Sequence, residues 1–534
     1  MKYYPMHMHL HTIHQPGASM ESHIYNAGLL GMKYIRFTDH DTRTGENDKT
    51  VKTFDFTRKE LQYENDAGIK RGWKPIGECE PIADGKTVTF SGSGVFGVEF
   101  FSDGQRHSRA LPAEVSLTLG MKHTISQGSR VILDILLSQR PPEHKEGHFL
   151  YVIGEPITEP RPYTASMNID ASPDGIYRLN ISRDLERYPA VGGLDNVFGT
   201  ISVIIEGEGS VSLSLLEISS VYGYNDLIVR QRAIAEKIGE RYGIKPFVTT
   251  EISSAGQHKN CFSSNVPVLD YTKGKITGDE AVAHILSHGG IFSYNHPFEC
   301  PKYKRKEFTR EEIDGIVAFE SAALIENKVF GAALIEVGFP LGRGLFTLED
   351  YIKLWDNLSA AGVFITGEGD SDCHKSHSRW FSGNNFASWI GVDDGLTHPI
   401  SEEVFGAAMV AGHLYMGDPV YLRGRVEFSC LGAEMGSVIV SDGGEYPISL
   451  LIEDLPEGAT VKLVRCGETV LEEQPTGDSY NRVYPITPSG SVDFIRAEMY
   501  NAEGRCVMLT NPIYFVEPGS AIAIPKERLA KVKK

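Results

Sequence analysis

The sequence predicts an α/β core that is interrupted by a β-sandwich insert and followed by a second β-sandwich. Residues 1–70 and 223–420 alternate short apolar strands with amphipathic helices, which is typical of a parallel α/β core. Residues 71–222 and 421–534 instead carry apolar residues at every second position between Gly, Pro and Asp turns, which is typical of β-sandwiches. We therefore expect four segments that build three domains.

Length and composition agree with several folded domains. The chain has 534 residues, of which 41% are hydrophobic and 23% charged. The net charge of −18 disfavours a nucleic-acid partner, and no apolar run is long enough to predict a membrane span. The 7 cysteines form no C-x-x-C pair, which suits a reducing compartment, and the N-terminus has no signal-peptide pattern. We expect a cytoplasmic protein.

The α/β segments predict their elements as follows. Residues 19–30 form a helix that Gly31 ends, between strands near 6–12 and 33–38. Residues 226–242 form an amphipathic helix, and Thr277 with Glu280 resembles a capping box that opens the next one. Further strands are expected at 247–252, 291–294, 316–319 and 363–366, with a helix near 349–361.

The β segments show their period of two most clearly in short stretches. In the insert these are residues 86–90, 115–119, 202–205 and 211–218, and in the C-terminal part residues 446–452, 460–464 and 513–515.

Histidines gather near the N-terminus. The chain has 18 histidines, and His7, His9 and His11 alternate along the first expected strand, so their side chains share one face. Three imidazoles on one face make a poor apolar core but converge well on a cation. The alternative interpretation is a solvated histidine-rich edge or the remnant of a tag.

Four later strands also deliver polar ligand types at or after their ends. The C-terminal strand ends of an α/β barrel form one face, where sites are assembled. We therefore expect one metal site from these scattered residues, which are His9, His11, His40, Glu251, His258, His296, Asp372 and His374.

These motifs resemble those of the PHP (polymerase and histidinol phosphatase) family. The resemblance rests on His9-Leu-His11-Thr12, Thr38-Asp39-His40-Asp41, His296-Pro297 and Asp372-Cys-His374. It implies a distorted (β/α)7 barrel that holds two or three divalent metal ions, usually zinc, manganese or iron.

The resemblance also implies a role for each residue. His9, His11, Glu251 and Asp372 would hold the first metal. Glu251 would bridge to a second metal bound by His258 and His296. His40 and His374 would serve a third metal or act on substrate.

Several alternatives stay open. The family usually has Asp where this chain has His7, only His14 follows the first motif as a further third-site ligand, and Glu78 or Glu80 could replace Glu251. Asp39 is a further candidate ligand. Four basic side chains near the motifs could anchor a substrate anion: Arg43, Lys259, Lys375 and Arg379.

The expected activity is hydrolysis of a small molecule. Imidazole and carboxylate ligands suit zinc, iron or manganese, and two such ions activate a water without a protein nucleophile. Asp372 would then be catalytic through the metal, and His40 or His374 could protonate the leaving group.

Three functions compete. The leading hypothesis is a phosphoesterase. Met416-Gly-Asp-Pro-Val, Glu434-Met-Gly-Ser and Leu509-Thr-Asn-Pro resemble a PHP branch that includes aryl carbamate hydrolases, so a carboxyl- or carbamate-ester hydrolase is the alternative. The third hypothesis is a carbohydrate-binding protein with a structural metal.

Overall fold

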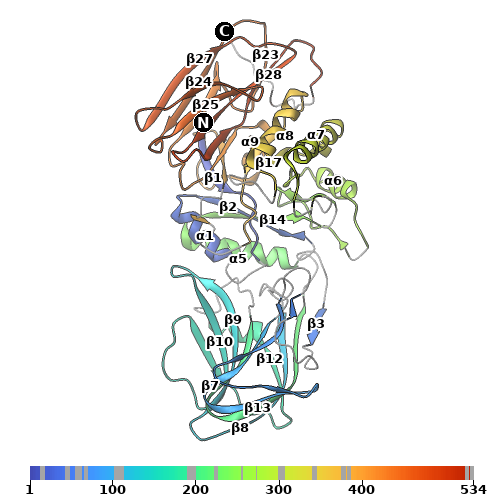
Figure 1. Ribbon diagram of the computed structural model, residues 1–534, viewed down its shortest axis with the longest axis vertical. Coiled ribbons are helices and arrows are strands. Elements are labelled where there is room, and N and C mark those ends of the chain that lie inside the picture. Colours follow the sequence, from blue (N-terminus) through green and yellow to red (C-terminus); the bar gives the residue numbers. More distant parts are fainter. Residues whose placement is uncertain are drawn as a thin grey trace.

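The computed structural model describes most of the chain and places its parts in three tiers. Strands of the C-terminal part lie at one end, the α/β core lies in the middle and the insert lies at the other end (Figure 1). The described residues are 1–12, 19–41, 49–53, 63–64, 70–101, 114–188, 200–221, 226–253, 256–271, 274–298, 303, 307–338, 345–374, 380–381, 386–522 and 528.

The α/β core is built on one mixed sheet. Its strands run in the order β18-β17-β16-β15-β14-β2-β1-β19-β20. Parallel ladders join β1 to β2, β2 to β14, β16 to β17 and β17 to β18, whereas β15 and β19 are antiparallel to their neighbours. The bounds are β1 Lys2–His7, β2 Tyr34–His40, β14 Lys245–Ile252, β15 Lys259–Cys261, β16 Phe292–Tyr294, β17 Leu334–Gly338, β18 Thr366–Gly369, β19 Ala387–Val392 and β20 Leu414–Gly417.

This core is α/β as predicted, but the described strands do not form a closed barrel. No backbone ladder among them joins β18 to β19. The two meet instead through a side chain, because Ser388 Oγ lies 3.0 Å from Gly369 N and 3.1 Å from Gly369 O. The predicted (β/α)7 closure is therefore not seen.

Six helices of the described chain accompany this sheet. The predicted capping box is confirmed: Thr277 and Glu280 bond each other's backbone N–H groups at the start of α6. The helices are α1 Met20–Leu29, α5 Asp226–Tyr242, α6 Gly278–Ser287, α7 Arg310–Glu326, α8 Leu348–Ala360 and α9 Glu402–Ala411. No helix in the described ranges is long and apolar enough to cross a membrane.

Two local predictions are wrong. Residues 316–319, expected to be a strand, lie inside α7, which a second capping box opens at Thr309 and Glu312. Within this run only Val317 is buried, and it packs with Ile313 on the inner face of the helix, whereas Phe319 is exposed. The first strand ends at His7 rather than near residue 12, so His9 and His11 stand on the segment beyond it.

The described part of the insert is all-β, as expected, apart from the one-turn helix α3 (Ile181–Leu185). Its longest strand, β13 (Ile201–Val221), pairs with β7, β8, β9 and β3 and replaces the two strands expected at 202–205 and 211–218. Strands β3 and β4 belong to this sheet, so it begins before residue 71. The strands are β3 Lys49–Thr53, β4 Tyr63–Glu64, β5 Lys70–Ile76, β6 Ile82–Ala83, β7 Val88–Phe101, β8 Glu114–Ile125, β9 Arg130–Arg140, β10 Lys145–Gly154, β11 Thr164–Asn168, β12 Ile176–Asn180 and β13.

The C-terminal part shares a sheet with the α/β core. Strand β20 pairs with β29, and the ladder continues through β28 and β25 to β26. A separate sheet runs β22-β21-β24-β27. The strands are β21 Val426–Cys430, β22 Ala433–Glu434, β23 Val438–Val440, β24 Tyr446–Glu453, β25 Thr460–Arg465, β26 Glu468–Glu473, β27 Ser479–Ile486, β28 Val492–Tyr500, β29 Cys506–Thr510 and β30 Ile513–Val516.

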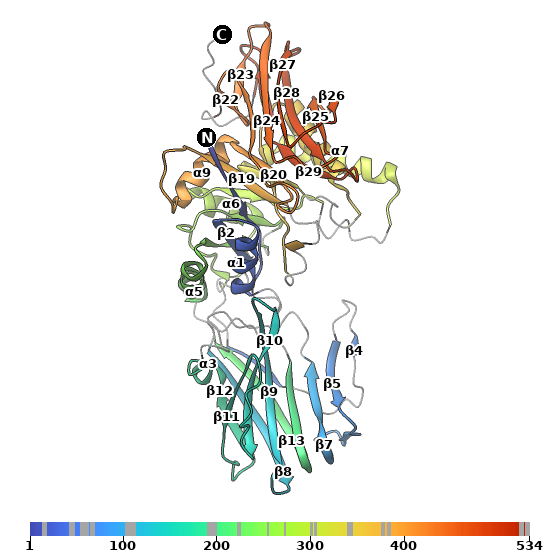
Figure 2. The same ribbon diagram turned by 90° about the vertical axis from the view of Figure 1, so that its left-hand side faces the viewer.

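The tip between β9 and β10 attaches the insert to helix α1, where both views show them side by side (Figures 1 and 2). The buried Glu21 carboxylate accepts from Arg140 Nη1 at 3.0 Å and from the Tyr242 hydroxyl at 3.1 Å. Arg241 contacts the same carboxylate, and Ser22 Oγ lies 3.3 Å from His144 Nδ1.

Candidate metal centre

The candidate ligands meet at the C-terminal ends of the core strands. His40 ends β2 and is the register partner of Glu251 on β14. The segments after β1 and β18 are tied together, because His11 N donates to Cys373 O at 3.1 Å and Leu10 forms a parallel bridge with Cys373. Residues far apart in sequence are thereby brought to one place.

The first group is His9, His11, Asp372 and Glu251. Asp372 Oδ1 lies 2.8 Å from His11 Nε2 and 3.2 Å from His9 Nε2, and these two nitrogens are 3.0 Å apart. Glu251 lies 3.5 Å from His9 Nε2 and 3.6 Å from His11 Nε2. Four donor atoms pointing at one small volume form the set that the resemblance implies for a first metal.

Glu251 also joins this group to a second one. Its Oε1 lies 3.0 Å from His258 Nδ1 and 3.3 Å from His296 Nε2, while Oε2 lies 2.6 Å from His40 Nδ1. A carboxylate that presents each oxygen to different imidazoles is suited to bridge two cations.

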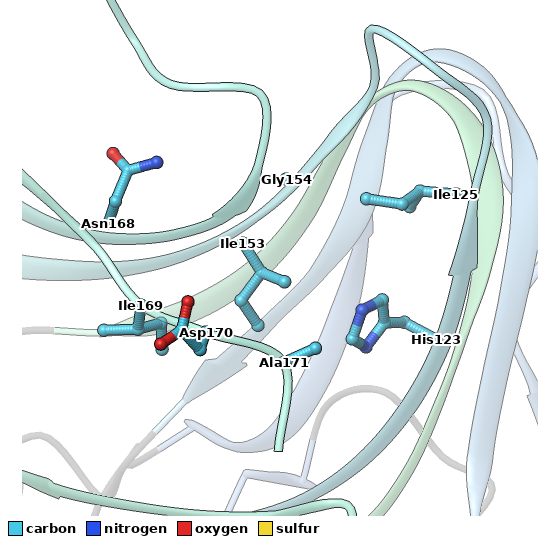
Figure 3. A pocket seen from close by; sticks show the side chains of 8 residues that line it. All are labelled: His123, Ile125, Ile153, Gly154, Asn168, Ile169, Asp170 and Ala171. Carbon is cyan, nitrogen blue, oxygen red and sulfur yellow. The ribbon is translucent and has the colours of Figure 1, made fainter. Parts of the chain in front are cut away.

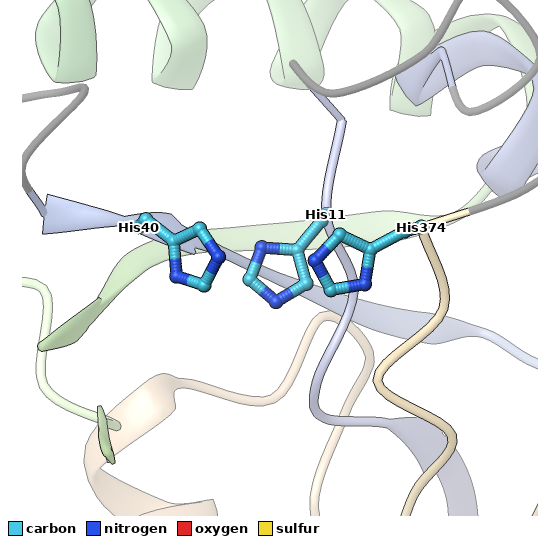
Figure 4. A group of neighbouring side chains, drawn as sticks. All are labelled: His11, His40 and His374. Atoms are coloured by element: carbon cyan, nitrogen blue, oxygen red, sulfur yellow. The ribbon is translucent and has the colours of Figure 1, made fainter. Parts of the chain in front are cut away.

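Three imidazoles form a third group, in which the His11 ring lies between those of His40 and His374 (Figure 4). The His11 ring centroid is 4.6 Å from that of His40 and 4.0 Å from that of His374. One nitrogen of each ring lies within 4.8 Å of the others. His11 thus faces both the first group and this one, whereas the sequence predicted it only as a ligand of the first metal.

The electrostatics of the centre act in both directions. Against the effect of burial, Asp372 and Glu336 raise the pKa of His9 well above its ordinary value, and Glu251 raises that of His258. Burial alone would raise the pKa of Glu251, but His9 and the bonded rings of His258, His296 and His40 hold it well below its usual value. Burial lowers the pKa of His11, well below its ordinary value, and also that of His374. Ionised carboxylate and neutral imidazole are the forms that bind metal, so Glu251, His11 and His374 favour binding, whereas His9 and His258 would release a proton when a metal binds.

Two of the candidate ligands have unusual backbone angles. His296 has φ 24° and Asp372 has φ 44°, a region that costs a non-glycine residue about 1–3 kcal/mol. The neighbouring structure therefore holds both side chains in orientations that a relaxed chain would not adopt. Such outliers concentrate at functional sites.

Glu336 on β17 supports the site but was not expected from the sequence. Its Oε1 lies 2.6 Å from His9 Nδ1, and its Oε2 accepts from the backbone N–H of His296 at 2.5 Å. Carboxylates of this kind orient metal-binding imidazoles. The signal was a lone Glu within the apolar stretch Leu334-Ile-Glu-Val-Gly338, a strand that was not predicted.

Two further buried carboxylates stand beside Glu336. Glu368 is its register partner on β18 and Asp370 Oδ1 lies 3.8 Å from His9 Nδ1. Burial and the Glu336 charge raise the pKa of both carboxyls. Neither was expected from the sequence, although both belong to the Glu368-Gly-Asp-Ser-Asp372 stretch that carries a ligand.

Asp39 and His7 lie beside the centre rather than among its donors. Asp39 accepts from the Thr12 amide and hydroxyl at 2.7 and 2.5 Å and from Gln231 Nε2 at 3.0 Å, and is 3.9 Å from His11 Nδ1. The His7 ring packs edge-on against Trp380 at 4.6 Å, and burial lowers its pKa to about 3.

The structure does not bring the other candidates together with the centre. Glu78 and Glu80 are exposed on the insert between β5 and β6. Lys259 is buried and donates from Nζ to Gln257 O at 2.6 Å, and burial lowers its pKa to about 8. The remaining candidates lie outside the described residues: His14, Arg43, Lys375 and Arg379.

A separate cavity of about 590 Å³ lies in the insert. Figure 3 shows the Asp170 carboxylate and the His123 ring on opposite sides, with Ile153 between them. The His123 ring lies 3.5 Å from the Tyr177 hydroxyl. This pocket has fewer convergent polar groups than the histidine centre, so it is the weaker candidate for chemistry.

Comparison with known proteins does not assign the chain to a family. No family model matches, and no curated protein matches. A family 12 xyloglucanase from Bacillus licheniformis shows 8% identity and a TM-score of 0.22 over 32% of this chain and 99% of its own. A family two carbohydrate esterase from Cellvibrio japonicus shows 10% identity and a TM-score of 0.15 over 68% of this chain and 96% of its own. Likenesses this low carry no argument about fold or function.

Proposed function

We propose that this protein is a metal-dependent hydrolase of the PHP type, and that its substrate is a small phosphate ester. The observation that supports the proposal is the arrangement of imidazoles around Glu251, whose two oxygens face different histidines. Asp372 adds a second carboxylate in contact with His9 and His11.

The donor set fits zinc, manganese or iron. Borderline metals prefer imidazole nitrogen mixed with carboxylate oxygen, whereas calcium and magnesium prefer oxygen alone. His9, His11, Asp372 and Glu251 would hold one ion, and Glu251, His258 and His296 a second. When bound, such ions lower the pKa of water toward neutrality and polarise the substrate.

Unequal exposure indicates where substrate enters. The side chains of His40, His258 and His374 are 20%, 34% and 29% exposed. Those of His9 and Glu251, in contrast, are at most 1% exposed. Substrate therefore approaches over the three exposed rings, and His40 or His374 is placed to give a proton to the leaving group.

The alternative is hydrolysis of a carboxyl or carbamate ester at the same centre. Lys259, one of the cations expected to bind a phosphate, directs its ammonium group to Gln257 O and is only 4% exposed. The ammonium group of Lys259 is therefore not exposed to bind a substrate anion, and this observation favours a neutral ester as the substrate.

The C-terminal motifs behind that alternative have a structural role in this fold. Met416 pairs with Leu509 in the β20–β29 ladder. Asn511 bonds both backbone groups of Gly367 at 2.9 Å and also Leu414 O at 2.8 Å. Asn511 thus supports β18, the strand that precedes Asp372, and none of these contacts indicates which class of ester is hydrolysed.

The carbohydrate-binding hypothesis loses one of its supports. Trp73, an aromatic residue at the start of the β insert that would suit sugar binding if its ring were exposed, is only 4% exposed and packs in the insert's apolar core. A sugar platform needs an exposed ring face.

Matched aryl substrates test the proposal. Protein reconstituted with zinc or manganese is assayed on an aryl phosphate, an aryl carboxyl ester and an aryl carbamate, beside Asp372→Ala and the surface control Asp394→Ala. We expect phosphate release that Asp372→Ala abolishes and Asp394→Ala retains. Ester or carbamate cleavage with the same sensitivity, and no phosphate release, would refute the phosphoesterase and support the alternative.

A further inference from the structure

His23 is a buried histidine on α1 that is not among the candidate ligands. Its side chain is 1% exposed. One ring nitrogen, Nε2, lies 3.2 Å from the backbone carbonyl of His11. The other, Nδ1, accepts from the indole N–H of Trp380 at 2.9 Å.

The chemistry of these two partners fixes the tautomer. An indole N–H can only donate, and a backbone carbonyl can only accept. Nδ1 of His23 must therefore carry a lone pair and Nε2 the proton. The ring is neutral and has its one donor aimed at His11.

His23 provides the second of two hydrogen bonds that hold the main chain of His11. On one side the His11 N–H donates to Cys373 O at 3.1 Å, and on the other its carbonyl faces His23. The next residue is fixed as well, because the Thr12 N–H donates to Asp39 at 2.7 Å. The main chain on both sides of the His11 side chain is thus held in one position.

We propose that His23 is a positioning residue for the metal centre, and that Trp380 selects the tautomer in which it works. The inference rests on the proposed function, since it concerns how His11 is presented to a metal. Trp380 follows the Asp372-Cys-His374 motif in the chain. The hydrogen bond between Trp380 and His23 therefore also links Trp380 to the backbone carbonyl of His11, in the first motif.

This main-chain geometry sets the orientation of the His11 ring. Its Nε2 must face Asp372 at 2.8 Å while its ring stacks on His374 at 4.0 Å. A rotation of the peptide that carries the carbonyl would turn the ring out of this position. Partners that orient a ligand in this way typically account for about 10–100-fold in metal affinity.

The test compares His23→Leu with His23→Gln in the full chain. Leu fills the space without polar atoms, whereas the Gln amide can donate to His11 O and accept from Trp380. Cobalt(II) binding is followed by its visible spectrum, and zinc affinity by chelator competition. We expect His23→Leu to weaken zinc binding about 10–100-fold and to alter the cobalt spectrum, and His23→Gln to recover at least part of the affinity.

Trp380→Phe removes the indole donor, and Trp355→Phe is its control, because Trp355 is also buried and bonded through Nε1, at 3.0 Å to Ile365 O. We expect only Trp380→Phe to change the cobalt spectrum. Unchanged zinc affinity and cobalt spectrum in His23→Leu, with a lower melting temperature, would overturn the proposal and leave a purely structural role. Because neither readout uses a substrate, a wild type that binds metal but hydrolyses no ester would refute the proposed function without deciding this inference.

Discussion

Replacing Glu336 by Gln tests whether this buried carboxylate prepares the centre for metal. Its two oxygens serve two donors, His9 Nδ1 at 2.6 Å and His296 N at 2.5 Å. Gln keeps the shape but has only one acceptor oxygen, so one of the two donors must face the amide NH₂. The charge that stabilises a proton on His9 Nδ1, and so keeps Nε2 free for the metal, is also lost.

The expected loss can be stated as an affinity. Removing such a partner costs about 10–100-fold in metal binding, which corresponds to about 1.4–2.8 kcal/mol. Zinc dissociation constants are measured by competition with a chromophoric chelator. Glu320→Gln is the matched control, since Glu320 on α7 is also buried but accepts from the Tyr303 hydroxyl, away from the centre.

A Glu336→Gln protein that binds zinc within twofold of wild type would refute this reasoning. It would mean that neither the His9 contact nor the His296 contact orients a ligand. A fall in melting temperature of the metal-free protein, with unchanged affinity, would lead to the same conclusion.

Three further predictions concern stability. Removing metal by chelator should lower the melting temperature and re-addition should restore it, because a ligand at 100 times its Kd stabilises the fold by about 2.7 kcal/mol; calorimetry with and without zinc measures this. The hydrogen bond to Asp134 raises the pKa of His148, against the effect of burial; its stabilisation is therefore full below the unfolded pKa of about 6.5 and lost as the pH rises through the higher folded value. His148→Gln should lower the melting temperature near pH 5.5 and leave it unchanged near pH 9. The loss in free energy of unfolding at pH 5.5 should be no more than about 1 kcal/mol, since the pair is partly exposed. An equal loss at both pH values would contradict this. Thr277→Ala should destabilise the protein by about 1 kcal/mol through the lost cap of α6, whereas Ser287→Ala at the far end should not, as urea denaturation can compare.

Local sequence signals predicted most helices and the long insert strands. The amphipathic helix at 226–242 is α5 to the residue, and the capping box at Thr277 begins α6. One failure arises because a short apolar run does not reveal its own period. Ile316-Val-Ala-Phe319 is such a run, and only its distant cap at Thr309 shows that it is helical.

The candidate site was predictable where a polar residue follows a strand, and less so where it lies inside one. Glu251, His296 and Asp372 come at or after strand ends and meet as expected. Glu336 sits within a buried strand and His23 within a helix, so position alone gave no hint of their role. Their contacts to His9 and His11 arise from tertiary packing, which composition and spacing do not encode.

The sheet shared by β20 and β29 bears on how the chain unfolds. One apolar cluster contains Ile24 of α1, Phe37 of β2 and Ile448 of the C-terminal part, whereas the insert packs its own cluster around residues such as Phe96 and Val203. We therefore expect the α/β core and the C-terminal strands to unfold as one cooperative unit, with the insert as a second. Calorimetry should resolve two transitions rather than three, and only the one that contains the core should move when zinc is added.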